Sequence, residues 1–461
     1  MVTLKDTIAA IATPMGVGGL GIIRVSGPKS EKIVRKLFKP RKRVDNFITH
    51  HLYHGEIVSP ETGATLDEVL LAFMRKPHSY TGEDTLEINC HGGPLILQTV
   101  LTEVSKAGAR LAEPGEFTRR AFLNNRLDLS QAEAVIDMIT AKTDRGLELA
   151  VSHLQGKLTG KIETLRTSVI DVLAILEASI DFSEEGADVE QNSEISKRIQ
   201  AVVDDLHAML ATYEQGKIYR YGINAVITGR PNVGKSSILN RLLGEKRAIV
   251  THIPGTTRDF IEEFTDIGSI PVRLTDTAGI RRSDDIIEQE SIALVREKLS
   301  SADIVLIVLD GSEDLTEEDA GIIEENRERK ALLVINKTDL PHVINIQKFH
   351  QLAPDLRPLW ISAKYGDGIP SLKEAIYTLA MKQDKEDHHS TMMITNIRHK
   401  TALERAATLL SQAKNSIVNG FSPEFPALDV REALESLEEI VGKTINEDIL
   451  DRIFSNFCIG K

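Results

Sequence analysis

The octapeptide Gly229-Arg-Pro-Asn-Val-Gly-Lys-Ser236 constrains this chain most, because it fits the phosphate-loop pattern G-x-x-x-x-G-K-[ST] without a gap. The apolar residues 224–228 before it predict a buried strand, and residues 237–243 after it predict a helix. Such a strand, loop and helix direct backbone N–H groups, a helix N-terminus and the Lys235 ammonium toward phosphates. An ordinary glycine turn would need neither the lysine nor this context. The chain is therefore predicted to bind a nucleoside triphosphate.

Length and charge limit the alternatives. At 461 residues the chain exceeds a single hydrophobic core, and its length predicts about three domains. No stretch approaches the roughly 18 apolar residues of a membrane span, and two cysteines, Cys90 and Cys458, cannot build a disulfide framework. We therefore expect a cytoplasmic protein that makes no membrane contact. The formal charge of −13 argues against a surface coated in positive charge for nonspecific nucleic-acid binding.

Apolar periodicity divides the chain into segments. Residues 1–120 carry short apolar runs broken by glycine and proline, which predict strands of a mixed α/β domain at residues 21–26, 68–73 and 85–89. Helical spacing dominates residues 121–220, where Ser130 and Glu133 match a capping box, and it returns over residues 381–461. The intervening residues 221–380 show a second α/β pattern, with apolar runs at residues 270–274, 304–309, 332–335 and 359–361.

The two helical segments have similar amphipathic character, and each must bury its apolar face. Packed against each other, residues 121–220 and 381–461 would form one discontinuous helical domain, with the α/β domain inserted between them. The ends of the insertion would then lie close together, as domain termini commonly do. Two independent helical modules are the alternative.

Polar clusters follow the predicted strands downstream of the phosphate loop. Asp276-Thr-Ala-Gly279 can contribute a carboxylate to a magnesium shell, and its glycine can offer an N–H to the γ-phosphate. Asn336-Lys-Thr-Asp339 and Ser362-Ala-Lys364 also follow strands, at the ends where open α/β sheets bind ligands. The Asp339 carboxylate can accept two hydrogen bonds from guanine, whereas adenine would face it with an acceptor. The predicted nucleotide is GTP.

These ordered elements resemble the translation-factor class of GTPases. They predict a multidomain α/β plus α fold: an N-terminal mixed α/β domain, a discontinuous helical domain and an inserted Ras-like P-loop GTPase domain. The predicted nucleotide-binding residues are Asn232, Val233, Gly234, Lys235, Ser236, Ser237, Thr251, His252, Ile253, Pro254, Gly255, Thr256, Thr257, Asp276, Thr277, Ala278, Gly279, Asn336, Lys337, Thr338, Asp339, Ser362, Ala363 and Lys364.

Magnesium is expected at Ser236 and at Thr257, the predicted switch threonine. For Thr256 alone, a plain turn residue remains as good an interpretation. Ile280 stands where Ras-like proteins place a water-orienting glutamine, and an apolar side chain cannot orient water. Another group must therefore supply this part of catalysis.

Motifs outside the nucleotide domain resemble the signatures of the MnmE (TrmE) family of tRNA-modification GTPases, and they extend to both ends of the chain. They are Gly18 to Gly27, Ser79 to Asp84, His91 to Pro94, Pro114 to Phe117, Arg120 to Asn124 and Phe457 to Lys461. The resemblance implies an N-terminal folate-binding and dimerisation domain (1–120), a helical domain (121–220 and 381–461) and a GTPase domain (221–380). This plan agrees with the segmentation drawn from periodicity.

The resemblance also implies a potassium ion at the phosphates, where other GTPases receive an arginine finger, and two GTPase domains that approach each other in a homodimer. Its implied ligands are the Asn232 side chain and main-chain oxygens of Thr251, Ile253 and Thr256. Glu288 matches the acid that orients the attacking water. From composition alone, Glu288 is one exposed acid among several.

In the N-terminal domain the resemblance implies a 5-formyltetrahydrofolate site formed by Arg24, Glu87, Arg126 and Lys461. Cations suit the folate carboxylates, and a carboxylate suits the donor edge of the pterin. Arg126 replaces a family lysine, which keeps the charge and changes the donor geometry. Without the resemblance, Arg24 and Glu87 predict an outward-facing salt bridge. Two interpretations of Cys458 stay open: folate or substrate chemistry, and a small buried apolar residue.

The implied activity is that of a potassium-dependent GTPase working with the FAD-containing partner MnmG in a heterotetramer. Together they would add an aminomethyl or carboxymethylaminomethyl group at C5 of a tRNA wobble uridine, with folate as the one-carbon source. A ribosome-assembly or RNA-binding GTPase switch is the alternative, but no KH-type G-x-x-G helix pair follows residue 380. Intact Lys235, Asp276 and Asp339 argue against a folate-dependent transferase with a vestigial GTPase.

Overall fold

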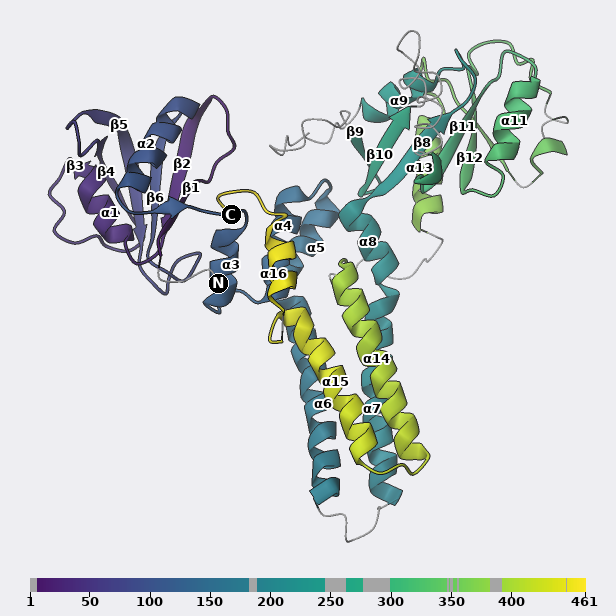
Figure 1. Ribbon diagram of the computed structural model, residues 1–461. Helices are drawn as coiled ribbons and strands as arrows, with labels where there is room; N and C mark the ends of the chain where they lie inside the picture. Colours follow the sequence, from purple (N-terminus) through teal and green to yellow (C-terminus); the bar gives the residue numbers. More distant parts are fainter. Residues whose placement is uncertain are drawn as a thin grey trace. The chain divides into compact units, whose positions relative to one another are not determined.

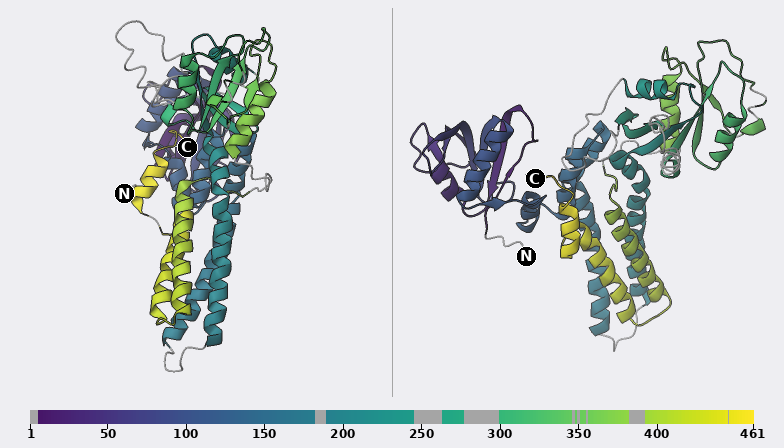
Figure 2. Two further views of the ribbon diagram at one scale, coloured as in Figure 1. Left: turned by 90° about the vertical axis from the view of Figure 1, so that its right-hand side faces the viewer. Right: turned by 45° about the horizontal axis from the view of Figure 1, so that its top comes forward.

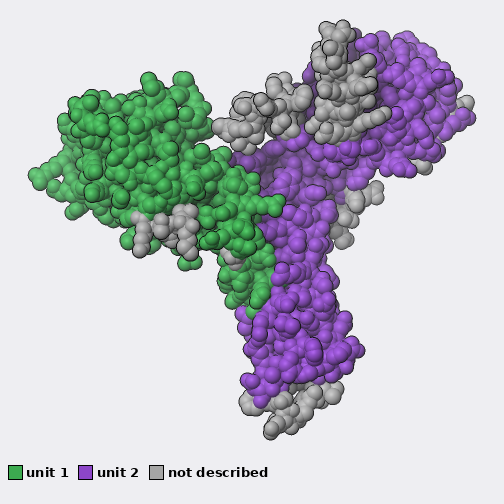
Figure 3. Space-filling view, viewed as in Figure 1, with its two compact units in different colours: residues 1–136, 153–167, 434–461 green, residues 137–152, 168–433 purple. Residues whose placement is uncertain are grey.

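The computed structural model describes residues 6–181, 189–244, 263–276, 299–345, 348, 351–354, 356–381, 392–444 and 446–461. The chain separates into two compact units (Figure 3). Unit 1 comprises residues 1–136, 153–167 and 434–461, and unit 2 comprises residues 137–152 and 168–433. The predicted fold class, multidomain α/β plus α, is confirmed. Among the helices within the described residues, none is long and apolar enough to cross a membrane.

A seven-stranded sheet occupies unit 1 (Figure 1), in the order β3-β4-β5-β6-β2-β1-β7. Only the β1–β7 pair is parallel among these described strands. The three predicted strands correspond to β2, β5 and β6. The bounds are β1 (Ile8–Ile11), β2 (Gly18–Ser26), β3 (Phe38–Pro40), β4 (His51–Val58), β5 (Thr65–Met74), β6 (Thr85–Gly92) and β7 (Arg110–Leu111).

Alternation along the strands decides which face of this sheet is buried. In β5, Val69, Leu71 and Phe73 are buried, whereas Leu70 between them is exposed. Helices α1 (Ser30–Leu37) and α2 (Pro94–Lys106) supply the other half of the core against the buried face. Each such side chain contributes roughly 1.5–3 kcal/mol on burial. The period-2 pattern of the sequence therefore fixes the side that the helices cover.

Helices from the two predicted helical segments pack together. Helix α7 (Val189–Ala211) runs beside α14 (Ile397–Val418) in Figures 1 and 2, and Lys414 Nζ lies 2.7 Å from Gln200 Oε1. Arg166 of α6 (Lys157–Asp181) pairs with Glu438 of α15 (Glu424–Val441) at 2.7 Å. Helices of the first segment thus pack against helices of the second, which contradicts the alternative of two independent helical modules. The remaining helices are α3 (Glu116–Leu123), α4 (Leu129–Thr140), α5 (Asp144–Leu154), α8 (Tyr213–Tyr221) and α16 (Glu447–Phe454).

The predicted capping box at Ser130 and Glu133 is wrong. Ser130 lies inside α4, and Asp128 caps the helix instead: the Gln131 N–H donates to Asp128 Oδ1, and the Asp128 N–H donates to Gln131 Oε1, both at 3.0 Å. The Ser130 hydroxyl donates to the same carboxylate at 2.7 Å. An ionised carboxylate accepts more strongly than a hydroxyl, so the aspartate takes the capping position.

A six-stranded sheet forms the α/β part of unit 2, in the order β13-β12-β11-β8-β10-β9, with only the β9–β10 pair antiparallel among these strands. Strand β11 is buried on both faces, because Ile304, Leu306 and Val308 enter one core while the residues between them enter another. All the predicted apolar runs form strands here. The elements are β8 (Ile223–Thr228), α9 (Lys235–Leu243), β9 (Glu263–Ile267), β10 (Ile270–Asp276), β11 (Ile304–Asp310), α11 (Glu317–Glu325), β12 (Ala331–Asn336), β13 (Pro358–Trp360) and α13 (Ile369–Met381).

Candidate functional site

The phosphate loop joins β8 to α9, as the sequence predicts. Two glycines are required by close approach: a Cβ on Gly229 would lie 2.3 Å from the Val308 carbonyl oxygen, and one on Gly234 would lie 2.2 Å from Asn336 Nδ2. Gly234 also has a φ of +97°, a conformation that side chains disfavour. Lys235 Nζ donates to the carbonyl oxygens of Gly229 and Arg230 at 2.9 and 2.6 Å. The loop therefore curls around the ammonium of its own lysine.

Two predicted magnesium-shell residues meet beside this loop. The Ser236 hydroxyl at the start of α9 donates to Asp276 Oδ2 at the end of β10, at 2.6 Å. The ends of β8 and β10 lie side by side because these strands pair in parallel, so the loop and helix that follow β8 lie next to Asp276. Hydroxyl and carboxylate oxygens are the hard ligands that Mg²⁺ takes, so the pair is chemically suited to that ion.

The predicted base-recognition residues also converge. Asn336 at the end of β12 binds two other segments: its Nδ2 donates to the Val233 carbonyl at 2.9 Å, and its Oδ1 accepts from the Ala363 N–H at 3.0 Å. The Ser362 hydroxyl donates to Asp339 Oδ1 at 2.7 Å. One amide thus connects the phosphate loop to the loop after β13, and one hydroxyl orients the carboxylate expected to read guanine.

Lys337 pairs with Asp310 at the end of β11, with 2.5 Å between Nζ and Oδ2. Burial of Asp310 opposes its ionisation, but Lys337 and Ser312 outweigh burial and lower the pKa of Asp310. Lys337 also has a φ of +65°, an uncommon conformation for a side-chain-bearing residue. The ion pair keeps this turn in place beside Asp339.

A hollow of about 760 Å³ lies between the phosphate loop and the residues that follow β12 and β13. The predicted residues that line it are Asn232, Gly234, Ser237, Asn336, Lys337, Asp339, Ala363 and Lys364. Three other lining residues, Asn240, Arg241 and Leu340, belong to no motif, and the sequence does not predict them. Only the three-dimensional path of α9 and of the turn after β12 brings them to the site.

Part of the predicted site lies outside the described residues. This part contains the remaining loop residues, the potassium-ligand carbonyls, Ile280 and the predicted catalytic acid: Thr251, His252, Ile253, Pro254, Gly255, Thr256, Thr257, Thr277, Ala278, Gly279 and Glu288. Of the described nucleotide residues, Val233 is buried and Thr338 donates its N–H to the Ile361 carbonyl at 3.2 Å.

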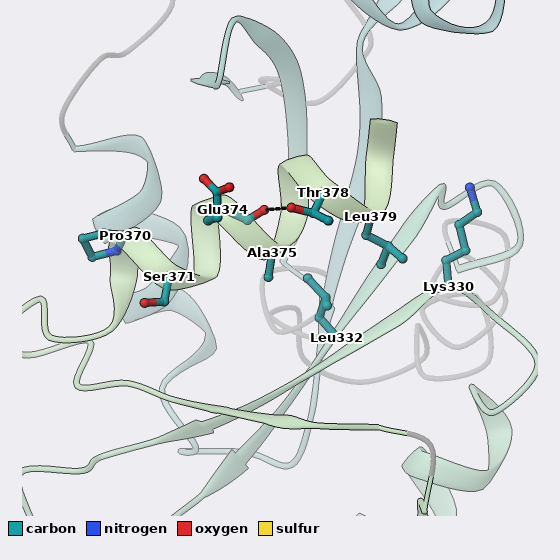
Figure 4. A pocket seen from close by; sticks show the side chains of 8 residues that line it. All are labelled: Lys330, Leu332, Pro370, Ser371, Glu374, Ala375, Thr378 and Leu379. Atoms are coloured by element: carbon teal, nitrogen blue, oxygen red, sulfur yellow. Dashed lines mark hydrogen bonds between the residues drawn. The ribbon is translucent and has the colours of Figure 1, made fainter. Parts of the chain in front are cut away.

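A second hollow in unit 2, of about 900 Å³, lies between β12 and α13 (Figure 4). Its lining is largely apolar or neutral around Leu332, Ala375 and Leu379, and the Thr378 hydroxyl donates to the Glu374 carbonyl at 2.8 Å. No predicted nucleotide residue lines this second hollow. The larger of the two hollows is therefore not the candidate nucleotide site.

In unit 1 the structure brings together three of the four predicted folate residues. Arg24 of β2 and Glu87 of β6 are direct cross-strand partners, and Arg24 Nε lies 2.9 Å from Glu87 Oε1. Arg24 Nη1 donates to the Gly460 carbonyl at 3.1 Å. The Phe117 N–H donates to the Lys461 carbonyl at 3.2 Å. The C-terminal residues therefore lie against the sheet, and the salt bridge expected for Arg24 and Glu87 is present.

The Arg126 side chain is exposed, and among the described contacts it makes no hydrogen bond to the other three residues. Burial and then the Arg24 charge lower the pKa of Lys461. Cys458 is exposed, so the interpretation of Cys458 as a buried apolar residue is wrong. Cys90 is the buried thiol, and burial followed by the Asp67 charge raises its pKa to about 12.

A phosphate loop, a magnesium-suited oxygen pair and an oriented base-reading carboxylate at the ends of parallel strands define a P-loop GTPase. Two family models match the chain: "GTP-binding protein TrmE N-terminus" over residues 7–126 and "MnmE helical domain" over residues 129–458. The chain belongs to the MnmE (TrmE) family.

Individual relatives match nearly the whole chain. A protein named "tRNA modification GTPase MnmE" from Syntrophus aciditrophicus is 55% identical, covering 99% of this chain and 100% of the relative. One with the same name from Natranaerobius thermophilus is 47% identical, again covering 99% and 100%. Among solved structures, the G domain of the T. maritima FeoB iron transporter matches with a TM-score of 0.27 and 26% identity, over 34% of this chain and 98% of that one.

Proposed function

We propose that this chain is a potassium-dependent GTPase that, together with MnmG, adds an aminomethyl or carboxymethylaminomethyl group at C5 of tRNA wobble uridine. GTP hydrolysis would drive the reaction cycle, and folate would supply the one-carbon unit. The observation that carries the proposal is a phosphate loop closed around Lys235, with the Ser236–Asp276 pair at its end, beside a hollow lined by Asn232 and Gly234 of the same loop and by Asp339, which Ser362 orients. Full-length similarity to relatives named "tRNA modification GTPase MnmE" supports the role in tRNA modification.

In this proposal the phosphate loop binds the triphosphate through its N–H groups, and the Lys235 ammonium moves from backbone carbonyls to phosphate oxygens. Ser236, with Thr257, would hold magnesium, while Asp276 lies within hydrogen-bond reach of Ser236. Magnesium when bound neutralises charge that develops on the phosphate oxygens. Glu288 would orient the attacking water, a role that Ile280 cannot take because its side chain has no polar atom.

Potassium would be held by the Asn232 side chain and by main-chain oxygens of Thr251, Ile253 and Thr256. Asn232 fits this role, because it is exposed, lines the hollow and lies within the phosphate loop, where its φ is +65°. In the proposed homodimer, the cation would supply the charge that other GTPases take from an arginine. An amide oxygen is a suitable hard ligand for such a cation.

GTP turnover should therefore depend on the monovalent cation. We expect turnover in potassium to exceed that in sodium by roughly 10²-fold or more at equal ionic strength, the scale of losing one charge-stabilising group. Asn232→Ala should bring the potassium rate down to the sodium rate while nucleotide affinity is retained. Steady-state phosphate release by the full chain measures both rates. Equal rates of the unmodified chain in the two salts would contradict a potassium site.

For the folate, the residues fit in part. Arg24 and Lys461 can bind the folate carboxylates, and Glu87 can accept from the pterin. Glu87 is paired with Arg24, so a pterin would share or displace that ion pair. Arg126, whose side chain is exposed, would be the fourth folate residue. 5-Formyltetrahydrofolate or a related folate is the proposed ligand, with Cys458 as a proposed accessory group.

The proposed domain plan is 1–120 for folate binding and dimerisation, 121–220 with 381–461 for the helical domain, and 221–380 for the GTPase. The proposed partners are a second copy, MnmG in a heterotetramer, and tRNA, in the cytoplasm. Nucleoside mass spectrometry of tRNA from cells lacking this chain tests the function. We expect the wobble-uridine modification to disappear and to return when the chain is supplied. Normal modification in those cells would reject the proposal.

A further inference from the structure

Arg241 binds the loop after β13 although it belongs to no sequence motif. It lies in the last turn of α9, the helix that begins with Lys235 and Ser236. Its Nε donates to the Ala363 carbonyl at 3.2 Å, and its Nη2 donates to the Lys364 carbonyl at 2.7 Å. One guanidinium therefore holds two successive carbonyl oxygens of this loop.

The loop that Arg241 holds contains the groups expected to recognise the base. Ser362 donates its hydroxyl to Asp339 at 2.7 Å, and Ala363 donates its N–H to Asn336 at 3.0 Å. The loop is closed by its own backbone, because the Gly366 N–H donates to the Ser362 carbonyl at 2.7 Å. Displacing the carbonyls of Ala363 and Lys364 would therefore shift the partners of both Asp339 and Asn336.

We propose that Arg241 is a positioning residue for guanine recognition, which fixes the loop 362–364 to the phosphate-binding helix. The inference rests on the guanine-nucleotide site proposed above. A planar guanidinium presents several N–H donors in a fixed geometry, whereas an ammonium is a single flexible point charge. Only the guanidinium geometry can bind two neighbouring carbonyl oxygens at once. The same helix then sets the phosphate end of the site through Ser236 and the base end through Arg241.

The test compares GDP with inosine diphosphate. Inosine diphosphate lacks the exocyclic amine from which Asp339 would accept a hydrogen bond. Arg241→Ala should weaken GDP binding by about tenfold, the scale of losing hydrogen bonds from a charged donor. Inosine diphosphate should lose less, because it does not use the full set of bonds to Asp339. The dissociation constant for inosine diphosphate divided by that for GDP should therefore fall. Titration of the full chain with both nucleotides measures this ratio.

Three variants sharpen the test. Arg241→Lys should give an intermediate ratio, since one ammonium can reach one carbonyl, and Arg241→Gln keeps a small donor if the alanine variant does not fold. Arg327→Ala is the matched control, because Arg327 is an exposed arginine of the same unit that pairs only with Glu324 at 3.6 Å among its described contacts. It should leave both constants unchanged.

The outcomes separate the two proposals. If the unmodified chain does not prefer GDP over inosine diphosphate, the guanine site itself is wrong. If that preference exists but Arg241→Ala weakens both nucleotides equally, Arg241 merely stabilises the domain and the positioning role is overturned. The positioning role would also be overturned if Arg241→Lys had the same two dissociation constants as the unmodified chain, since positive charge alone would then suffice.

Discussion

Asp339→Asn should transfer the base preference of this GTPase from guanine to xanthine, with GTP affinity falling by roughly 10⁴-fold. The carboxylate can accept from both N–H groups of guanine, and one of its oxygens is already oriented by the Ser362 hydroxyl at 2.7 Å. An amide at this position keeps an oxygen for Ser362 and turns its NH₂ toward the base. That donor meets the amino group of guanine unfavourably and the C2 carbonyl of xanthine favourably.

Competition binding and turnover with GTP and XTP check this prediction. Asp339→Asn should bind and hydrolyse XTP at close to the rate that the unmodified chain shows with GTP. Asp303→Asn is the matched control, because Asp303 is an exposed aspartate that accepts from the Asn224 N–H at 2.8 Å, at the opposite end of β8. Unchanged GTP affinity in Asp339→Asn would mean that another group reads the base.

Sequence predicts the nucleotide site well where the chemistry is local. Gly229, Gly234 and Lys235 are fixed by the strand-to-helix turn itself, so their spacing carries the geometry. Asp276 and Asp339 follow apolar runs, and parallel pairing places the ends of those strands at one edge of the sheet. The apolar periods also predict the helices, since Leu403, Leu410 and Ile417 of α14 are all buried.

Prediction fails where a role depends on contacts between distant segments. Arg241 is indistinguishable in sequence from any basic residue in the last turn of a helix. The capping position of α4 was decided by competition between neighbouring oxygens, which Asp128 wins over Ser130. Spacing along a chain does not determine the direction of a side chain at the end of a helix.

Arg120→Met should destabilise unit 1 by about 3–5 kcal/mol, the scale of removing one partner from a buried ion network. Arg120 of α3 is fully buried and pairs with Asp6 at 2.6 Å, Glu116 at 2.9 Å and Glu83 at 3.2 Å. Methionine keeps most of the volume, so the loss would report the missing charge and hydrogen bonds. Glu83 and Glu116 would then be left with fewer donors in a buried site.

The same network makes unit 1 sensitive to acid. Burial opposes ionisation of Asp6 and Glu116, but hydrogen bonds from Arg120 and Arg110 outweigh it, so both pKa values are lowered. A lowered pKa in the folded state means that ionisation stabilises the fold above the unfolded-state pKa, and that this stability is lost as pH falls. The loss should begin as the pH falls below about 5. Arg120→Met should show a weaker dependence of stability on pH in this acid range, because Asp6 and Glu116 lose a partner.

Hydrogen exchange of the full chain, followed by mass spectrometry, locates the effect of Arg120→Met. Peptides covering β2 and β6 should exchange faster in the variant, whereas those covering β8 and β11 should not change. The single tryptophan, Trp360, lies in β13 of unit 2, so its fluorescence gives an internal control. Arg43→Ala is the surface control, since Arg43 and Asp45 are 89% and 74% exposed. Unchanged exchange in β2 and β6 would show that the network contributes little, because buried ion pairs can cost in desolvation as much as they return.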